Sequence, residues 1–161
     1  GEEAESLALY GQFIGEWTFD CEYYREDGKV ERASGEWSFS WALEGSAIED
    51  VWTYPSRAER ALTGKSYGGL GVTVRTYDPK GKSWNIAWSA ANGYFLLLKG
   101  AREGDEIVQF GAEAGGRLVR WIFFGITSDS FLWRAESSAD RGATWRRTQL
   151  MKVHRKEAND A

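Results

Sequence analysis

Apolar and polar residues alternate one by one along most of this chain, which is the pattern of β-strands that bury one face. In the first such segment large apolar side chains stand at Trp17, Phe19, Cys21 and Tyr23, with polar residues between them. The pattern predicts about ten strands. After the first they lie at about 37–43, 48–54, 70–77, 84–89, 94–99, 107–110, 118–124, 130–137 and 144–154.

Short turns separate these segments, and no helical pattern comes between them. Asp27-Gly28 and Asp78-Pro79-Lys80-Gly81 are typical tight turns, because Gly tolerates positive φ and Pro fixes its own φ. Strands joined in this way pair antiparallel. A meander of strands with one apolar face is most stable as a closed barrel, since closure leaves no strand edge exposed. The sequence therefore predicts an all-β fold: one domain over 1–161, an antiparallel up-and-down β-barrel.

Three segments depart from the alternation. Residues 2–13 are predicted to form a short helix, because Leu7, Tyr10 and Phe13 are spaced by three and acidic residues occupy the first turn. Residues 55–68 form the longest irregular stretch and are predicted to be a loop over a barrel mouth. Residues 155–161 are polar and are predicted to be a frayed tail.

Composition narrows the classes of function. The 161 residues include nine Trp, aromatic residues make up 15% of the chain, and the net charge is −4. Such aromatic content argues against disorder, and the acidic balance gives no reason to expect a nucleic-acid partner. One Cys and one His exclude a disulfide framework, a multi-thiolate metal site and a cluster of histidines within the chain. We expect no cofactor.

No run of about 18 apolar residues occurs, so neither a transmembrane helix nor a membrane partner is expected. The acidic N-terminal segment lacks the basic and apolar regions of a signal peptide. Because Cys21 is unpaired, a cytoplasmic location is expected, but the sequence does not decide whether a leader peptide has been removed. It also does not decide whether the chain forms a homodimer.

Two short features resemble the calycin superfamily of lipocalins, fatty-acid-binding proteins and nitrobindins. Gly15-Glu16-Trp17 opens the first strand after a short helix, and the last strand carries the basic residues Arg146, Arg147 and Lys152. The resemblance implies that the Trp closes the barrel bottom and that a basic residue from the final strand packs over it.

A further pattern is similar to an uncharacterised bacterial family of single-domain calycin-like barrels. This likeness implies the fold and leaves the function open. The pattern comprises Trp41-Ala42-Leu43-Glu44-Gly45, Val74-Arg75-Thr76-Tyr77-Asp78-Pro79, Trp84, Trp88, Gly100, Gly111 and the hairpin from Ser138 to Trp145.

That hairpin also looks like the Asp-box, Ser-x-Asp-x-Gly-x-Thr-Trp, of sialidase-type propellers. A propeller needs several copies, and Ser138–Trp145 is the one copy in this sequence. We interpret it as a well-made hairpin turn.

Alternation places many aromatic rings on the inner wall of the predicted barrel. The rings either fill the barrel or line a cavity, since a barrel of about ten strands is wide enough to be hollow. We expect a cavity that binds a small hydrophobic or aromatic molecule. Trp84 and Trp145, beside turns, are predicted to be structural plugs. The tryptophans predicted to contact the ligand are Trp37, Trp41, Trp52, Trp88, Trp121 and Trp133.

The same alternation turns several polar side chains inward. They are Tyr23, Asp50, Tyr54, Arg147 and Gln149, with Arg75 as a further candidate on a strand of ambiguous register. All are candidate ligand contacts. An unpaired buried charge is costly, so we expect Asp50 and Arg147 to form an ion pair.

The alternative function is a cofactor-independent isomerase, cyclase or lyase in the same cavity. In that interpretation Asp50 is the general base, Arg147 binds a carboxylate of the substrate, and Tyr23 donates a hydrogen bond. His154 is the sole candidate haem ligand, but its alternation with Lys152 predicts an outward side chain. Cys21 is interpreted as a small buried apolar residue.

Overall fold

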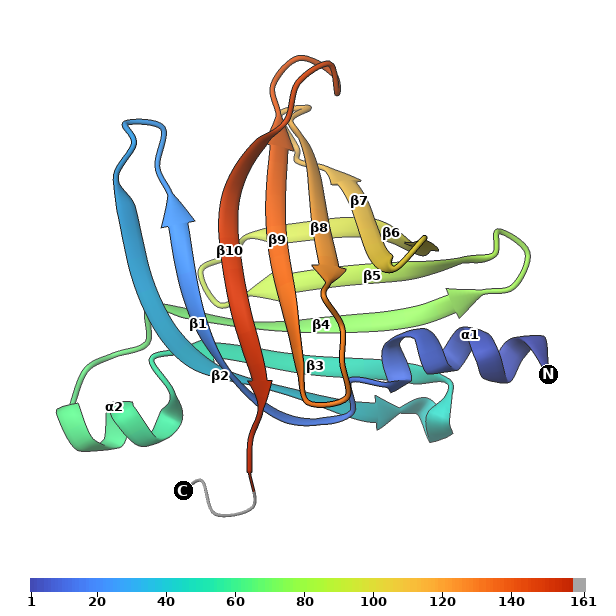
Figure 1. The fold of residues 1–161 in the computed structure, drawn as a ribbon, viewed down its shortest axis with the longest axis horizontal. Coiled ribbons are helices and arrows are strands. Elements are labelled where there is room, and N and C mark those ends of the chain that lie inside the picture. The colour runs from blue at the N-terminus through green and yellow to red at the C-terminus, as the bar shows by residue number, and fades with distance from the viewer. Residues whose placement is uncertain (158–161) are drawn as a thin grey trace.

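The computed structural model describes residues 1–157, which form a closed barrel of ten antiparallel strands (Figure 1). Each strand pairs with its neighbours in sequence, and β1 pairs with β10 to close the sheet. The predicted all-β up-and-down barrel is confirmed. The strands are β1 (Gly15–Tyr24), β2 (Val30–Ala42), β3 (Ala47–Tyr54), β4 (Gly69–Asp78), β5 (Ser83–Ala90), β6 (Phe95–Glu103), β7 (Glu106–Ala112), β8 (Leu118–Phe124), β9 (Ser130–Ser138) and β10 (Arg146–Arg155).

The register of β1, β2 and β3 follows from their aromatic faces. Trp17 lies opposite Trp37, which lies opposite Trp52, so three indole rings from neighbouring strands share the inner wall. Phe19 stacks on Trp52 with 5.2 Å between ring centroids. The polar residues that alternate with them face solvent, as the sequence pattern requires. A turn of 3-10 helix, η1 (Leu43–Gly45), joins β2 to β3.

Helix α1 (Glu2–Gly11) covers one end of the barrel (Figure 1). It is slightly shorter than the predicted 2–13, but the apolar stripe is buried as expected: Tyr10 and Phe13 are at most 1% exposed. Phe13 stacks on Phe123 at 4.7 Å, and the indole N–H of Trp17 donates to the Phe13 carbonyl at 2.7 Å. This end of the barrel is filled with aromatic side chains.

Arg155 corrects the prediction of a frayed tail from residue 155 onward. It is the last residue of β10, and its guanidinium lies over the Trp17 ring at 4.1 Å. The same group donates to the Ile14 carbonyl at 2.9 Å. Arg155 is therefore the basic residue that packs over the barrel-closing Trp, in place of Arg146, Arg147 or Lys152. The predicted tail at 158–161 lies outside the described residues.

The stretch 55–68 also differs from its prediction, because it contains helix α2 (Arg57–Thr63). The Ser56 hydroxyl accepts from the Glu59 backbone N–H at 3.1 Å, which caps the helix at its start. Gly64 ends it in the left-handed conformation. The signal was present in the sequence as Ser56 followed three residues later by Glu59, a spacing typical of helix starts. Neither α1 nor α2, the two α-helices described here, is long and apolar enough to cross a membrane.

The Ser138–Trp145 segment is a hairpin turn held by its own side chains. Asp140 accepts from the Thr144 backbone N–H at 2.8 Å and from the Thr144 hydroxyl at 2.5 Å, and these hydrogen bonds lower its pKa to about 2. Trp145 does not plug the barrel as predicted. The turn leaves it on the outer face, under the Arg120 guanidinium at 3.8 Å. The other predicted plug, Trp84, is 1% exposed inside the barrel.

Candidate functional site

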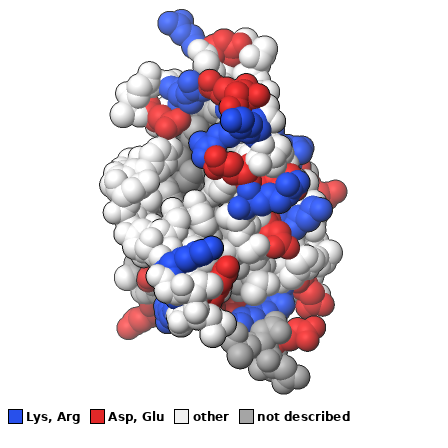
Figure 2. Space-filling view, turned by 90° about the vertical axis from the view of Figure 1, so that its left-hand side faces the viewer, with Lys and Arg blue, Asp and Glu red and all other residues white. Residues whose placement is uncertain are grey.

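The barrel encloses a cavity of about 730 Å³ that opens at the end away from α1. Its mouth lies between the β1–β2 hairpin, the start of β4 and the β5–β6 and β7–β8 turns. Figure 2 looks toward this side of the molecule and shows a hollow in its upper half, with charged side chains crowded beside it. The charged residues that line the cavity at the mouth are Arg25, Glu26, Glu113, Arg117 and Arg146.

Five tryptophans line the cavity in one continuous series. Trp37 contacts Trp133 with 6.4 Å between ring centroids, and Trp133 contacts Trp121 at 5.6 Å. Trp121 meets Trp88 edge to face at 6.0 Å, and Trp88 meets Trp52 in the same way at 6.1 Å. Aromatic rings prefer such tilted contacts, so the rings hold one another in place. The cavity walls are thus rigid and predominantly aromatic.

Glycines at the start of β4 leave room for these rings. A Cβ at Gly71 would overlap the Trp88 ring, and a Cβ at Gly69 would lie 2.8 Å from the Trp52 ring. Gly71 pairs with Trp52 across the β3–β4 ladder. The glycine-rich run therefore lets large rings stand on the inner wall close to the mouth.

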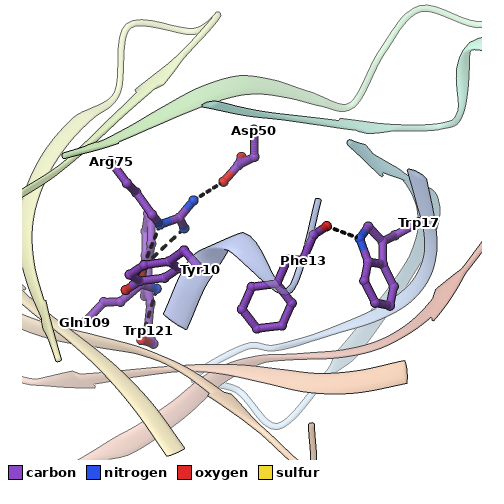
Figure 3. Close-up of polar contacts among 7 residues, drawn as sticks. All are labelled: Tyr10, Phe13, Trp17, Asp50, Arg75, Gln109 and Trp121. Atoms are coloured by element: carbon purple, nitrogen blue, oxygen red, sulfur yellow. Dashed lines mark hydrogen bonds and ion pairs between the residues drawn. The ribbon is translucent and has the colours of Figure 1, made fainter. Parts of the chain in front are cut away.

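A buried polar cluster forms the floor of the cavity, between the open space and α1 (Figure 3). Arg75 on β4 forms an ion pair with Asp50 on β3. Its Nε and Nη2 donate to the Gln109 side-chain oxygen at 3.2 and 3.1 Å. The Tyr10 hydroxyl donates to the same oxygen at 3.1 Å, and the Gln109 amide nitrogen donates to the Trp121 carbonyl at 3.2 Å. The cluster links β3, β4, β7 and β8 to α1.

Tyr10, Asp50, Arg75 and Gln109 are each at most 2% exposed. The Arg75 guanidinium also lies over the Tyr10 ring at 4.7 Å. Burial raises the pKa of the Tyr10 hydroxyl above its ordinary value, which keeps the hydroxyl protonated as a hydrogen-bond donor. Arg75 lines the cavity, whereas Asp50 lies behind it.

Two buried polar atoms near the floor have no hydrogen-bond partner among the described residues. They are the indole nitrogen of Trp37 and the Oδ1 atom of Asp50. Trp37 is 4% exposed and lines the cavity. Unpaired buried polar atoms are uncommon in folded proteins, and both of these atoms are fully buried, so neither faces the open space of the cavity.

A second polar group lies higher on the wall, where β1 meets β10. The Gln149 amide donates to the Cys21 thiol at 3.2 Å, and the Tyr23 and Tyr54 rings are 6.1 Å apart. Burial raises the pKa of Cys21 to about 11 and raises that of Tyr23 as well. Cys21 is therefore a neutral thiol at physiological pH, in agreement with its interpretation as a buried apolar residue.

The structure gathers most of the predicted ligand contacts around this one cavity. Their role in binding stays a prediction. The residues that line it are Tyr23, Trp37, Trp52, Tyr54, Arg75, Trp88, Trp121, Trp133 and Gln149.

Arg147 was predicted to face inward, and this is wrong. A β-bulge between Arg147 and Gln149 shifts the β9–β10 register by one residue, which turns Arg147 outward and brings Arg146 and Thr148 to the cavity. The predicted Asp50–Arg147 ion pair does not form, and Asp50 pairs with Arg75 instead. The proposed catalytic set of Asp50, Tyr23 and Arg147 is therefore not assembled.

Trp41 does not line the cavity either. It has the inward alternation of Trp37, but it lies at the far end of β2, beyond the cavity floor. There its ring packs over Gly11 of α1, where a Cβ would come within 2.7 Å, and it remains 46% exposed. His154 is exposed on the outer face, as its alternation predicted. Within residues 1–157, no cluster of three or more His, Cys, Asp or Glu could hold a metal ion.

Sequence reasoning missed Gln109, Thr73 and Met151, which lie among the buried residues at or near the floor. Gln109 shares the inward alternation of Ile107, and this polar residue at an inward position was a usable signal. Tyr10 was assigned to a helix stripe, but only the folded barrel shows that its hydroxyl reaches β7.

Comparisons with solved structures show the fold. The chain is similar to the S-type phycobiliprotein lyase CPES from Guillardia theta, with a TM-score of 0.64, 12% identity and coverage of 97% of this chain and 98% of that one. It is also similar to Rv2717c from M. tuberculosis, with a TM-score of 0.62, 10% identity and coverage of 94% and 98%. No protein-family model and no curated protein sequence matches it. Both likenesses, together with the closed ten-strand antiparallel barrel, fit the calycin-like fold that the sequence resemblance implied.

Proposed function

We propose that this barrel binds a small, flat, hydrophobic molecule in its central cavity. The observation that carries the proposal is the cavity itself, about 730 Å³ with five tryptophans in its walls. Cavities for small organic ligands measure about 300–1,000 Å³ and combine apolar walls with a few placed polar groups. The aromatic walls and the buried floor around Arg75 match that description.

Binding is favoured by the burial of apolar surface against walls that are already ordered. The edge-to-face contacts among Trp52, Trp88 and Trp121 fix the rings before any ligand arrives, so little side-chain entropy is lost on binding. The charged mouth stays in water while the rings below it are shielded. Acid–base catalysis by the predicted set would need Arg147 in the cavity, where the structure does not place it.

Titration with pyrene tests the proposal, because energy transfer from the wall tryptophans to a bound pyrene reports occupancy directly. We expect saturable transfer with one pyrene per chain. Ala135→Phe should weaken it, since Ala135 lines the cavity at 5% exposure and a phenyl ring there takes up part of the space.

Ala87→Phe is the matched control. Ala87 lines a separate apolar groove of about 540 Å³ on the outer face of β4–β7, together with Val74, Leu97 and Phe110. Pyrene binding that is unchanged in Ala87→Phe and weakened in Ala135→Phe supports the cavity. The reverse result, or no saturable transfer in the unmodified protein, would refute the proposal.

A further inference from the structure

We propose that two copies of this chain form a symmetric dimer through the outer face of strands β3 to β7. The inference concerns the outside of the barrel and is independent of what the cavity binds. It comes from an apolar stretch of outer surface and from two opposite charges on that surface, on β3 and β6, which have no counter-charge within the described chain.

The outer surface of the barrel is polar on one side and apolar on the other. An antiparallel strand that faces water should carry polar residues at its outward positions. Strands β1 and β2 follow this rule, with the outward pairs Thr18 and Glu36, Asp20 and Ser34, and Glu22 and Arg32. Strands β3 to β7 depart from it, with the outward residues Val51, Val72, Val74, Phe95, Leu97 and Phe110, which we call the apolar outer face.

No described part of the chain covers the apolar outer face. Leu97 is 62% exposed, Phe95 58% and Val74 41%. Val74, Leu97 and Phe110 also line the groove beside Ala87, so the face is hollowed at its centre. A contiguous exposed apolar surface on a folded domain marks a place where another molecule packs.

Two opposite charges lie on this face, and they are too far apart to pair within one chain. Glu49 on β3 lies beside Val74, and Lys99 on β6 lies beside Phe110. Three strand spacings, about 14 Å, separate β3 from β6. The Lys99 amine donates to the Asn85 side chain, and Glu49 has no hydrogen-bond or ion-pair partner among residues 1–157.

A second copy of the chain supplies both missing counter-charges. A twofold axis that lies in the interface and passes between β4 and β5 places Glu49 of each copy opposite Lys99 of the other. Such a contact is self-complementary, as a symmetric dimer requires, and it forms two equivalent ion pairs on either side of the apolar residues. An uncharged lipid surface would offer no counter-charge to Glu49 or Lys99, so charge complementarity favours a second copy.

The extent of the face sets the expected strength of the dimer. Strands β3 to β7 span about 19 Å and the three rows of outward residues span about 13 Å. With the side chains at the edges, the footprint is roughly 500 Å² on each copy. A total of about 1,000 Å² is the lower limit for a specific interface. We therefore expect a reversible dimer with a dissociation constant in the micromolar range.

Sedimentation equilibrium from low micromolar to millimolar protein tests the proposal. The mass should rise with concentration from 18.1 kDa toward twice that value. Val74→Lys should keep the chain monomeric, because it buries a charge at the centre of the contact. Val30→Lys is the matched control: both valines are 41% exposed on strands, but Val30 begins β2, beside the β1–β2 hairpin. That variant should dimerise like the unmodified chain.

Exchange of the two charges tests the symmetry of the contact. Glu49→Lys and Lys99→Glu should each raise the dissociation constant by about tenfold or more, because like charges then face each other at both ends. An equimolar mixture of these two variants should recover the dimer, since opposite charges meet at both ends of the mixed pair. Recovery cannot come from within one chain, because β3 and β6 are not neighbours.

Several results would overturn the proposal. One is a chain that stays monomeric to millimolar concentration, and another is a dimer that withstands Val74→Lys or is lost equally in Val30→Lys. A mixture of the charge variants that does not dimerise would overturn the twofold arrangement. A monomer that floats with phosphatidylcholine vesicles, and stops doing so in Val74→Lys, would assign the face to a membrane instead. Pyrene binding inside the barrel is unaffected by any of these outcomes, so the two proposals fail separately.

Discussion

Breaking the Arg75–Asp50 ion pair from one side should destabilise the barrel strongly. In Arg75→Met the Asp50 carboxylate, 0% exposed, loses its partner, and the side-chain oxygen of Gln109 loses two of its three donors. Removing one partner of a buried pair costs about 3–5 kcal/mol in free energy of unfolding. A domain of this size is stable by about 5–15 kcal/mol, so the change is large enough to measure.

Urea-induced unfolding followed by tryptophan fluorescence measures this free energy. Asp50→Leu should cost a similar amount, because it leaves the Arg75 guanidinium buried without a counter-charge. The double variant Asp50→Leu/Arg75→Met should recover most of the loss, since removing both charges also removes their desolvation cost. Arg25→Met is the control: Arg25 and Glu31 form an ion pair at 2.6 Å with both side chains 58% exposed, and such pairs contribute about 0–1 kcal/mol.

Two results would refute this reasoning about the floor. The first is a cost below about 1 kcal/mol for both single variants, which is the range of a solvated pair. The second is a double variant as unstable as the sum of the single changes, since independent side chains would behave in that way.

Two further predictions concern the hairpin and the packing of α1. Thr144→Val should raise the pKa of Asp140 from about 2 toward the usual carboxyl range, as followed by carboxyl-carbon NMR; an unchanged pKa would contradict the role given to the Thr144 hydroxyl. Because this pKa is lowered by folding, the charged Asp140 stabilises the hairpin above the usual carboxyl pKa, and the contribution is lost as the pH falls toward about 2. Gly100→Ala places a Cβ 2.5 Å from the Tyr10 hydroxyl and should destabilise the protein by about 1–3 kcal/mol in urea unfolding. Gly115→Ala, with no atom within 4 Å of its Cβ, should cost far less, and equal costs would rule out the packing explanation.

The fold could be predicted from the sequence because a strand with one buried face carries its own signature. Trp17, Phe19 and Cys21 alternate with polar residues, and short turns leave antiparallel pairing as the only connection. The cavity walls followed from the same rule. Trp88, Trp121 and Trp133 face inward because no bulge interrupts the pairing of β5, β8 and β9 around them.

The site could not be predicted where the alternation is interrupted or ends. One extra residue in β10 turned Arg147 outward, and no local feature of the sequence announced that bulge. Trp41 has the inward alternation, but α1 occupies the end of the barrel where Trp41 lies. The alternation of a strand does not show where a helix packs. The partner of Asp50 is Arg75, from the neighbouring strand β4, and choosing it required the register of that strand.

A crystal structure grown in the presence of pyrene tests the central claim most directly. The account predicts one pyrene molecule inside the barrel, with its ring system among Trp88, Trp121 and Trp133. A cavity occupied only by water, with the probe absent or seated in the outer groove beside Ala87, would contradict it.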